Sequence, residues 1–417
     1  MSKNYKSIYE NVGDSSALNQ SWYAVLESTR GVMGDPVNES FFYTRAGGSV
    51  EHTQPKESSD HRSGRHHTDI IKQKKETSWS IPTYVNIDTT LPAASFTEVD
   101  PGIRLLWKSL LGYEDLSAGA LYDPREDPSI SFTLFETGDK WQNQIPACFV
   151  ENMTLDAPGD GTSTMEWSGG GADRFKVGIG LSTTDNNGGN TVTLADVSEA
   201  KRFPVGGKVM LVQYSDGVTR STDTAVGSYR VVTATDPSTG VVTLDGAALA
   251  DADGTAGGGV LLAYAEPDQP TGIADIQTGL VGSIAIDGLG GIQDCVRSFS
   301  LEFANNHERV AYCYGTDALA SPYFVAGGRL DVSVSVELNL NDNTIEWLYD
   351  LDQFTANDIE FILGDATSRH LQIDLPKVIF DVPSVTVPET GSIPFSADGM
   401  AFQTTLDAFD EVTAHYK

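Results

Sequence analysis

Strict alternation of apolar and polar side chains predicts two long, half-buried β-strands in the C-terminal half of the chain. Residues 330–340 alternate without interruption, with leucine or valine at every even position. Residues 296–303 alternate in the same way, with Phe299, Leu301 and Phe303 on one face. The opposite, polar faces of the two strands consist of hydroxyl and carboxylate side chains: Ser298, Ser300, Glu302, Asp331, Ser333, Ser335 and Glu337. This pattern is typical of a sheet with one buried and one hydrated face.

Shorter runs of the same kind predict strands along most of the remaining chain. Glycine, at 41 of 417 residues, suits the many tight turns that such a chain needs. The further strands predicted in the main part of the chain are 21–29, 72–87, 130–136, 147–155, 162–168, 370–381, 393–397 and 411–416. The pattern therefore predicts a mainly β, α+β protein.

Two helices are predicted. In the first, Asp100 can cap the helix, Pro101 occupies its first turn and Gly112 ends it. Its apolar face is Ile103, Leu106, Trp107, Leu110 and Leu111. The second helix begins at Asn343, with Glu346 completing a capping box. Its predicted buried face is Ile345, Leu348 and Tyr349.

Residues 171–270 are predicted to form a separate unit inserted into the main domain, which comprises 1–170 and 271–417. Glycines at 169–171 and the proline-containing run 266–270 bound this unit. The short strands predicted within it are 174–181, 190–195, 207–214, 228–235, 240–245 and 259–265. We therefore expect a small all-β barrel or sandwich as an insertion.

The charge of the chain restricts its partners. There are 58 acidic and 27 basic residues, a formal net charge of −31. Such a body repels phosphate, which argues against sequence reading of nucleic acid and against anionic membrane surfaces. Solubility or adaptation to concentrated salt would explain the excess. No apolar run approaches 18 residues and the first residues lack an apolar segment, so we expect neither a membrane span nor a signal peptide.

One segment, about 45–75, runs against the acidic trend. The polar stretch 49–68 within it lacks apolar periodicity and is predicted to be an extended loop. The basic residues of the segment are Arg45, Lys56, Arg62, Arg65, Lys72, Lys74 and Lys75. A basic arm on an acidic protein favours an acidic partner, and in a self-assembling protein that partner is another copy. We therefore predict contacts between subunits for these residues.

Known catalytic and cofactor-binding motifs are missing from the sequence. The four histidines His52, His61, His66 and His67 match no metal-ligand spacing, so a solvated arm is favoured over a zinc site. Residues 251–254 resemble the start of a calcium loop, but position 12 would be Leu262 instead of glutamate. The three cysteines, without paired spacing, suggest core residues. We expect no enzymatic activity, no cofactor and no metal.

Several segments, taken in order, resemble the tail tube proteins (major tail proteins) of tailed viruses of bacteria and archaea. The segments share strand-and-turn patterns with that family, without any chemical signature, and leave out the insertion. They are 26–31, 72–88, 147–155, 162–171, 296–306 and 369–397.

The resemblance implies a β-sandwich or barrel core with a flanking helix, and six copies in a ring. Stacked rings would form the conduit for genome delivery, with the 45–75 loop reaching a neighbouring subunit and the insertion decorating the outside. Partners would be other copies, the tape measure, tail terminator and baseplate proteins, and passing double-stranded DNA without specific binding. Assembly would take place in the host cytoplasm and the protein would reside in the virion tail.

A duct for DNA should not bind DNA, so its wall should carry carboxylates and hydroxyl groups. The polar faces of 296–303 and 330–340 fit such a wall, and an ordinary hydrated sheet face is the alternative interpretation. Another virion protein, such as a baseplate, capsid-decorating or glycan-binding module, is the alternative function. An acidic secreted hydrolase is disfavoured because a catalytic motif is missing.

Overall fold

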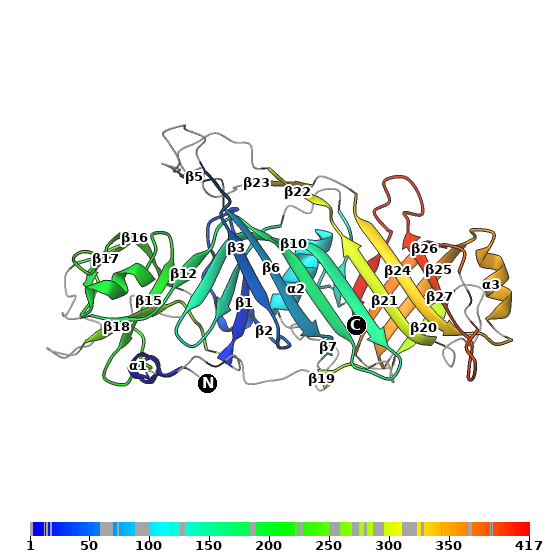
Figure 1. Cartoon of the computed structure of the whole chain (residues 1–417), viewed down its shortest axis with the longest axis horizontal. Helices are drawn as coiled ribbons and strands as arrows, with labels where there is room; N and C mark the ends of the chain where they lie inside the picture. The colour runs from blue at the N-terminus through cyan, green and yellow to red at the C-terminus, as the bar shows by residue number, and fades with distance from the viewer. Residues whose placement is uncertain are drawn as a thin grey trace.

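The computed structural model is mainly β, as the alternation predicts, and its strands form large antiparallel sheets (Figure 1). It describes the chain except for residues 1–2, 12, 14–15, 17–18, 59–69, 73–74, 88–100, 118, 126–129, 183–188, 222–223, 225–227, 250–258, 269–274, 279–281, 287–295, 311–322, 327–328, 343, 366–368, 384 and 386.

Seven neighbouring strands form what we call the polar-faced sheet. In spatial order they are β3 (Ser49–Thr53), β6 (Glu76–Tyr84), β11 (Thr164–Gly171), β10 (Gln142–Pro158), β21 (Val296–Ala304), β24 (Asp331–Asn339) and β27 (Pro394–Ala401). Buried and less buried residues alternate along β6, β11, β21, β24 and β27. The alternation predicted for the two long strands is confirmed, with Phe299, Leu301 and Phe303 buried in β21.

A second layer packs against the apolar side of this sheet. It contains β25 (Ala356–Gly364), β26 (His370–Phe380), β20 (Ser283–Ile286), β28 (Thr413–Tyr416) and β8 (Ala120–Tyr122). The ring of Phe299 in β21 stacks on that of Phe361 in β25, with their centroids 4.1 Å apart. The main core is therefore a sandwich of two sheet layers.

Helix α2 (Pro101–Leu111) packs into the same core. Its predicted apolar face is confirmed: Ile103, Leu106, Trp107, Leu110 and Leu111 are all buried. Trp107 Nε1 donates a hydrogen bond to the hydroxyl of Tyr416 at 3.0 Å. Gly112 adopts φ +95°, as a glycine that ends a helix commonly does.

The face predicted for the second helix is wrong at two of its three residues, and the third, Leu348, is partly buried against the core. Helix α3 spans Ile345–Leu351, but Ile345 and Tyr349 are exposed, whereas Trp347 and Leu351 are buried. Trp347 Nε1 donates to Asn357 Oδ1 at 3.0 Å, and its ring packs edge-on against Phe380 at 5.3 Å. The position of the neighbouring strands β25 and β26 selects the buried face of this two-turn helix.

Strand β10 belongs to two sheet regions because it bends. Its first part pairs with β9 (Phe132–Thr137) and β12 (Phe175–Val177), and its second part pairs with β11 and β21. Strand β9 continues to β1 (Ser21–Leu26) and β2 (Phe41–Phe42), which follows the short helix η2 (Asn38–Ser40). Ala147, between the two parts, has a φ of +52°. This left-handed backbone lets one strand serve both regions.

A six-stranded sheet with its own hydrophobic core lies within residues 180–264. Its order is β13 (Gly180–Leu181), β18 (Val260–Tyr264), β15 (Lys208–Gln213), β16 (Arg230–Asp236), β17 (Val241–Leu244) and β14 (Thr191–Thr193), with helix η3 (Val197–Arg202) beside it. The barrel predicted for the insertion does not close by strand pairing in the described residues. One isolated bridge, Ser182 to Leu194, joins the two edge strands.

The N-terminal helix α1 (Tyr5–Glu10) packs on this smaller core. Tyr5 is buried there, its amide donates to Gly217 O at 2.8 Å, and its hydroxyl donates to Glu266 at 2.7 Å. A six-residue helix is too short to be stable alone, so these contacts stabilise it. Every helix in the described part of the chain is too short or too polar to cross a membrane.

The extended loop predicted for residues 45–75 is partly strand. Residues 49–53 form β3, which pairs with β6 along its whole length, and β4 (Lys56–Ser58) pairs with β5 (Ile70–Lys72) in a ribbon. A polar edge strand lacks the apolar alternation on which the prediction relied. A second ribbon, of β22 (His307–Val310) and β23 (Tyr323–Ala326), lies at the same end of the molecule (Figure 1). Two further short strands, β7 (Asn86–Ile87) and β19 (Asp275–Ile276), pair with each other.

Candidate functional site

The polar-faced sheet carries the residues predicted to line a conduit, and it brings them together on one continuous face. The hydrated positions of β21 and β24 are half-buried or exposed in the subunit and lie directly opposite one another. The pairs are Ser298 with Glu337, Ser300 with Ser335, Glu302 with Ser333, and Ala304 with Asp331. The predicted side chains therefore form a two-strand patch of hydroxyl and carboxylate groups.

The register extends this patch across neighbouring strands. One row runs from Tyr84 in β6 to Asp398 in β27, and its members are Tyr84, Thr164, Asp156, Ser300, Ser335 and Asp398. The next row is Pro82, Glu166, Thr154, Glu302, Ser333 and Met400. Directly opposed residues on antiparallel strands share one face of the sheet. The first row is therefore polar across six strands, whereas the second row is polar across four, with Pro82 and Met400 at its ends.

Three carboxylates of this face were not predicted from the sequence. They are Asp156 in β10, Glu166 in β11 and Asp398 in β27. The hydroxyl of Ser335 donates to Asp398 Oδ1 at 2.6 Å, and that of Ser80 donates to Glu166 Oε1 at 3.3 Å. Alternation along each strand identifies these side chains as hydrated, but only the order of the strands shows that they adjoin β21 and β24.

One cation of the polar face belongs to its strands. The pairing of β21 with β24 shifts register between Val296 and Ser298, so Arg297 faces the solvent. Its guanidinium donates to Glu337 Oε1 at 2.8 Å. Arg297 is the one lysine or arginine in the sequences of the seven strands. The face therefore keeps an excess of carboxylates, with Glu337 locally neutralised.

The basic segment is used partly within its own chain. Lys75 Nζ lies 3.2 Å from Asp173 Oδ2, and the guanidinium of Arg45 lies over the ring of Tyr84 at 5.1 Å. Lys56 is exposed in β4, and Lys72 ends β5. The remaining predicted contact residues, Arg62, Arg65 and Lys74, lie outside the described residues.

The histidines considered as metal ligands are not gathered in the described structure. His52 Nδ1 lies 2.8 Å from the hydroxyl of Thr77, and its ring faces Asp173. His61, His66 and His67 lie outside the described residues. Among the residues that the structure describes, no group of three or more potential ligands surrounds a common point.

A buried carboxylate, Glu136 in β9, is the most unusual ionisable group near the junction of the two cores. It is 5% exposed and accepts hydrogen bonds from Gln20 Nε2 at 2.7 Å and Asn143 Nδ2 at 2.6 Å. Burial raises its pKa, and the two amides oppose that effect. Glu136 is held by amide donors, without a neighbouring nucleophile or second acid in the described structure, and this indicates a structural role for its carboxylate.

Aromatic side chains in the six-stranded sheet lie in its core. Phe203, Tyr229 and Tyr264 are buried, and Tyr214 is half-buried beside the N-terminal helix. A glycan-binding module needs exposed aromatic rings on a concave face, and these four residues do not supply them. Cys148 is also buried, and burial raises the pKa of its thiol, which makes it unreactive at neutral pH.

Comparison with known proteins does not assign this chain to a family. No family model matches the sequence, and no curated protein matches it significantly. The functional argument therefore depends on the residues and their geometry.

Proposed function

We propose that this protein is a structural subunit of a viral tail tube, a homohexameric ring that stacks into a conduit for double-stranded DNA. The proposal has no enzymatic component and places the protein in the virion tail after assembly in the host cytoplasm. Its other partners would be the tape measure, terminator and baseplate proteins. The sequence resemblance suggests the role, and one structural observation carries it.

That observation is the width and the chemistry of the polar-faced sheet. Its four central strands carry serine, threonine and carboxylate side chains on this face, with Tyr84, Pro82 and Met400 at the margins. Arg297, beside Glu337, is the one lysine or arginine within the seven strands, and Arg45 lies over Tyr84 at the edge. Phosphate groups passing such a wall meet repulsion and hydroxyl groups, and they find no row of lysine or arginine to hold them. This is the surface that a DNA conduit requires.

The outer edge of the sheet supports assembly from identical copies. Strand β3 pairs with β6 on one side, and none of the described strands pairs with its other side. An unpaired edge is a template for a strand of another chain. A neighbouring subunit in a ring would complete β3 and make the polar face continuous from copy to copy.

Electron microscopy of the purified recombinant protein tests the proposal. We expect rings or hollow rods in negative stain at about 1 M salt, where screening of the net charge favours association. A cryo-EM reconstruction should then place Asp156, Glu302 and Asp398 on the inner wall. A protein that stays monomeric at high concentration and high salt contradicts the proposal, and so does a lumen lined by lysine and arginine. If the polar face is only an ordinary hydrated sheet face, the reconstruction should show it pointing away from the lumen.

A further inference from the structure

The loop between β27 and β28, residues 402–411, projects a single leucine into solvent. Leu406 is 90% exposed, the largest fraction among the large apolar residues of the described chain. The loop around it is held in one shape. Asp410 accepts hydrogen bonds from the amide of Thr404 at 2.9 Å and from its hydroxyl group.

The same loop stores backbone strain. Asp407 has φ +61° and Phe409 has φ +51°, both in the left-handed region, which aspartate tolerates and a bulky residue such as phenylalanine avoids. A bulky residue in this conformation lowers the stability of the fold by roughly as much as one hydrogen bond contributes. It keeps the conformation only where the surrounding contacts hold it there. Within this loop Leu406 remains in solvent. We call residues 402–411 the knob loop.

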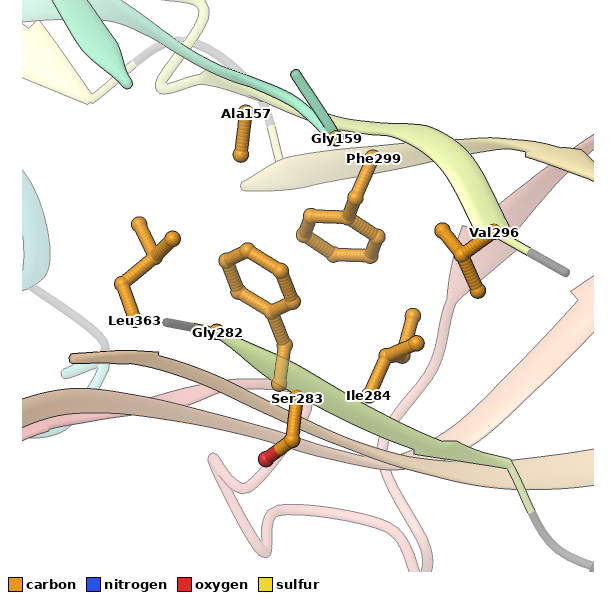
Figure 2. Close-up of a pocket in the computed structure, with 9 residues that line it drawn as sticks. Ala157, Gly159, Gly282, Ser283, Ile284, Val296, Phe299 and Leu363 are labelled. Atoms are coloured by element: carbon orange, nitrogen blue, oxygen red, sulfur yellow. The ribbon is translucent and has the colours of Figure 1, made fainter. Parts of the chain in front are cut away.

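A pocket lined by apolar side chains together with the polar groups of Gly159, Gly282 and Ser283 opens between the two layers of the main sandwich (Figure 2). Its volume is about 110 Å³, and its apolar lining is Ala157, Ile284, Val296, Phe299, Phe361 and Leu363. Figure 2 shows the side chains of Val296, Ile284 and Leu363 around the ring of Phe299. A cavity of ~150 Å³ holds a benzene ring, so this smaller space suits one branched aliphatic side chain.

The knob loop and the pocket lie at opposite ends of the polar-faced sheet. Strand β21 begins at the pocket with Val296 and ends at Ala304, opposite Asp331 of β24. Strand β27 runs from Pro394, opposite Asn339, to Met400, opposite Ser333, and the knob loop follows it. The loop therefore leaves the sheet where β21 ends, about 25 Å from the pocket along the strands. A subunit cannot fill its own pocket with Leu406.

We propose that Leu406 of one copy inserts into the pocket of the next copy, in a head-to-tail contact that stacks subunits along the strand direction. The inference deepens the proposed function, on which it rests, by assigning the contact between successive rings. A projection at one end and a complementary pocket at the other form a heterologous contact, which generates open filaments.

The distribution of charge favours this orientation. The pocket end carries exposed carboxylates on the 159–161 turn, on the turn after β24 and on the loop before β27: Asp160, Asp342 and Glu389. The knob end carries the exposed cations Lys56 and Arg329 beside Glu57 and Asp407. Two pocket ends would repel each other, whereas a pocket end against a knob end brings carboxylates to cations.

A charged knob tests the contact. The variant Leu406→Asp should fold normally because the side chain is exposed, and circular dichroism checks this. It should raise the midpoint concentration of association, measured by light scattering, at least tenfold, and leave separate rings instead of rods. Val205→Asp, at a 56% exposed position of the six-stranded sheet region, is the matched control. Association of Leu406→Asp at the same midpoint as this control overturns the contact.

A disulfide between copies tests it independently of tube formation. Leu406→Cys and Val296→Cys are made as separate proteins, each with Cys295→Ser and Cys313→Ser, mixed and mildly oxidised. A cross-linked pair of the two proteins supports the contact, and a yield no higher than with Val205→Cys in place of Val296→Cys overturns it. If the wild type forms neither rings nor rods while the cross-link appears, the proposed function fails and the contact stands. If wild-type rods form and neither test responds, the tube stands and the contact fails.

Discussion

At the scale of single residues, Glu27 holds the bend of β10. Its buried carboxylate accepts hydrogen bonds from Ala147 N at 2.8 Å and Thr133 Oγ1 at 2.8 Å on one oxygen. Its other oxygen accepts from Gly31 N at 2.7 Å and Ser131 Oγ at 2.9 Å. One side chain therefore ties the strained φ of Ala147 to β9 and to the turn after β1. Hydrogen bonds to a charged acceptor are the strong ones in proteins.

Replacing Glu27 should therefore destabilise the main core. Glu27→Ala leaves buried donors without their acceptor, and we expect the free energy of unfolding to fall by about 3 kcal/mol. Tryptophan fluorescence in a urea titration measures this, because Trp22, Trp79, Trp107, Trp167 and Trp347 are all buried in the main core. Glu302→Gln, on the exposed polar face, is the control and should change stability by less than ~0.5 kcal/mol. Equal effects of the two variants would contradict the assigned role.

Glu136 should make stability depend on pH. Burial raises the folded-state pKa of Glu136, so the folded protein takes up this proton before the unfolded chain as the pH falls. The ionised form therefore costs stability above the folded pKa, and this cost declines as the pH falls through that pKa and is fully lost below the lower pKa of the unfolded chain. Asn143 Oδ1, buried without a hydrogen-bond partner in the described structure, can accept from an amide at position 136 once the Asn143 side chain flips.

We therefore expect Glu136→Gln to stabilise the protein by roughly 1 kcal/mol at pH 7.5 and by almost nothing at pH 4. Urea titrations at the two pH values measure the difference. Glu136→Ala is the contrasting variant, because it removes the charge and leaves both amides unpaired. A loss of stability with Glu136→Gln at pH 7.5 would show that the ionised carboxylate is the favourable form.

At the scale of elements, the sequence predicts the strands that have the core on one face and water on the other. Strands β21 and β24 alternate strictly because one face meets the core and the other meets water. Strand β25 also alternates, with Ile359, Phe361 and Leu363 buried, so its sequence carries the same signal although it is not among the predicted strands. Strand β3 gives no such signal, because a polar edge strand buries little. The buried face of α3 depends on which strands surround it, and composition does not determine that.

The β4–β5 ribbon offers a test of the predicted contact between subunits. Replacing residues 56–72 by a short Gly-Ser linker keeps β3 and its pairing with β6 intact. The subunit should therefore fold with unchanged thermal stability in scanning calorimetry. We expect it to lose rod formation in negative stain, because it loses the exposed Lys56 and the other basic residues predicted to contact an acidic neighbour, Arg62, Arg65 and Lys72. Rods of normal length from the shortened protein would refute the assembly role of this segment.

At the scale of the whole molecule, the candidate site emerges from the order of the strands. The sequence predicts that β21 and β24 each have a polar face, but it does not reveal that Asp156, Glu166 and Asp398 continue that face on neighbouring strands. Strand order depends on contacts between residues far apart in the chain, such as those of β10 with β21. Arg297 was overlooked for a related reason: a shift of register between paired strands sets its direction.

The acidic face leads to a prediction about DNA. Reversing three of its charges with Asp156→Lys, Glu302→Lys and Asp398→Lys places cations on β10, β21 and β27 of the same face. Assembled tubes of this variant should retain double-stranded DNA in a gel-shift or sedimentation assay, with binding that weakens steeply as salt rises. The wild type should retain none.

The control variant carries Asp342→Lys, Asp350→Lys and Asp352→Lys on the exposed surface around α3, which change the net charge by the same amount. If both triple variants bind DNA equally, net charge alone governs binding and the polar face has no special relation to the conduit. If only the variant on the polar face binds, and its DNA resists nuclease until the tubes are dissociated, the reversed charges line an enclosed channel.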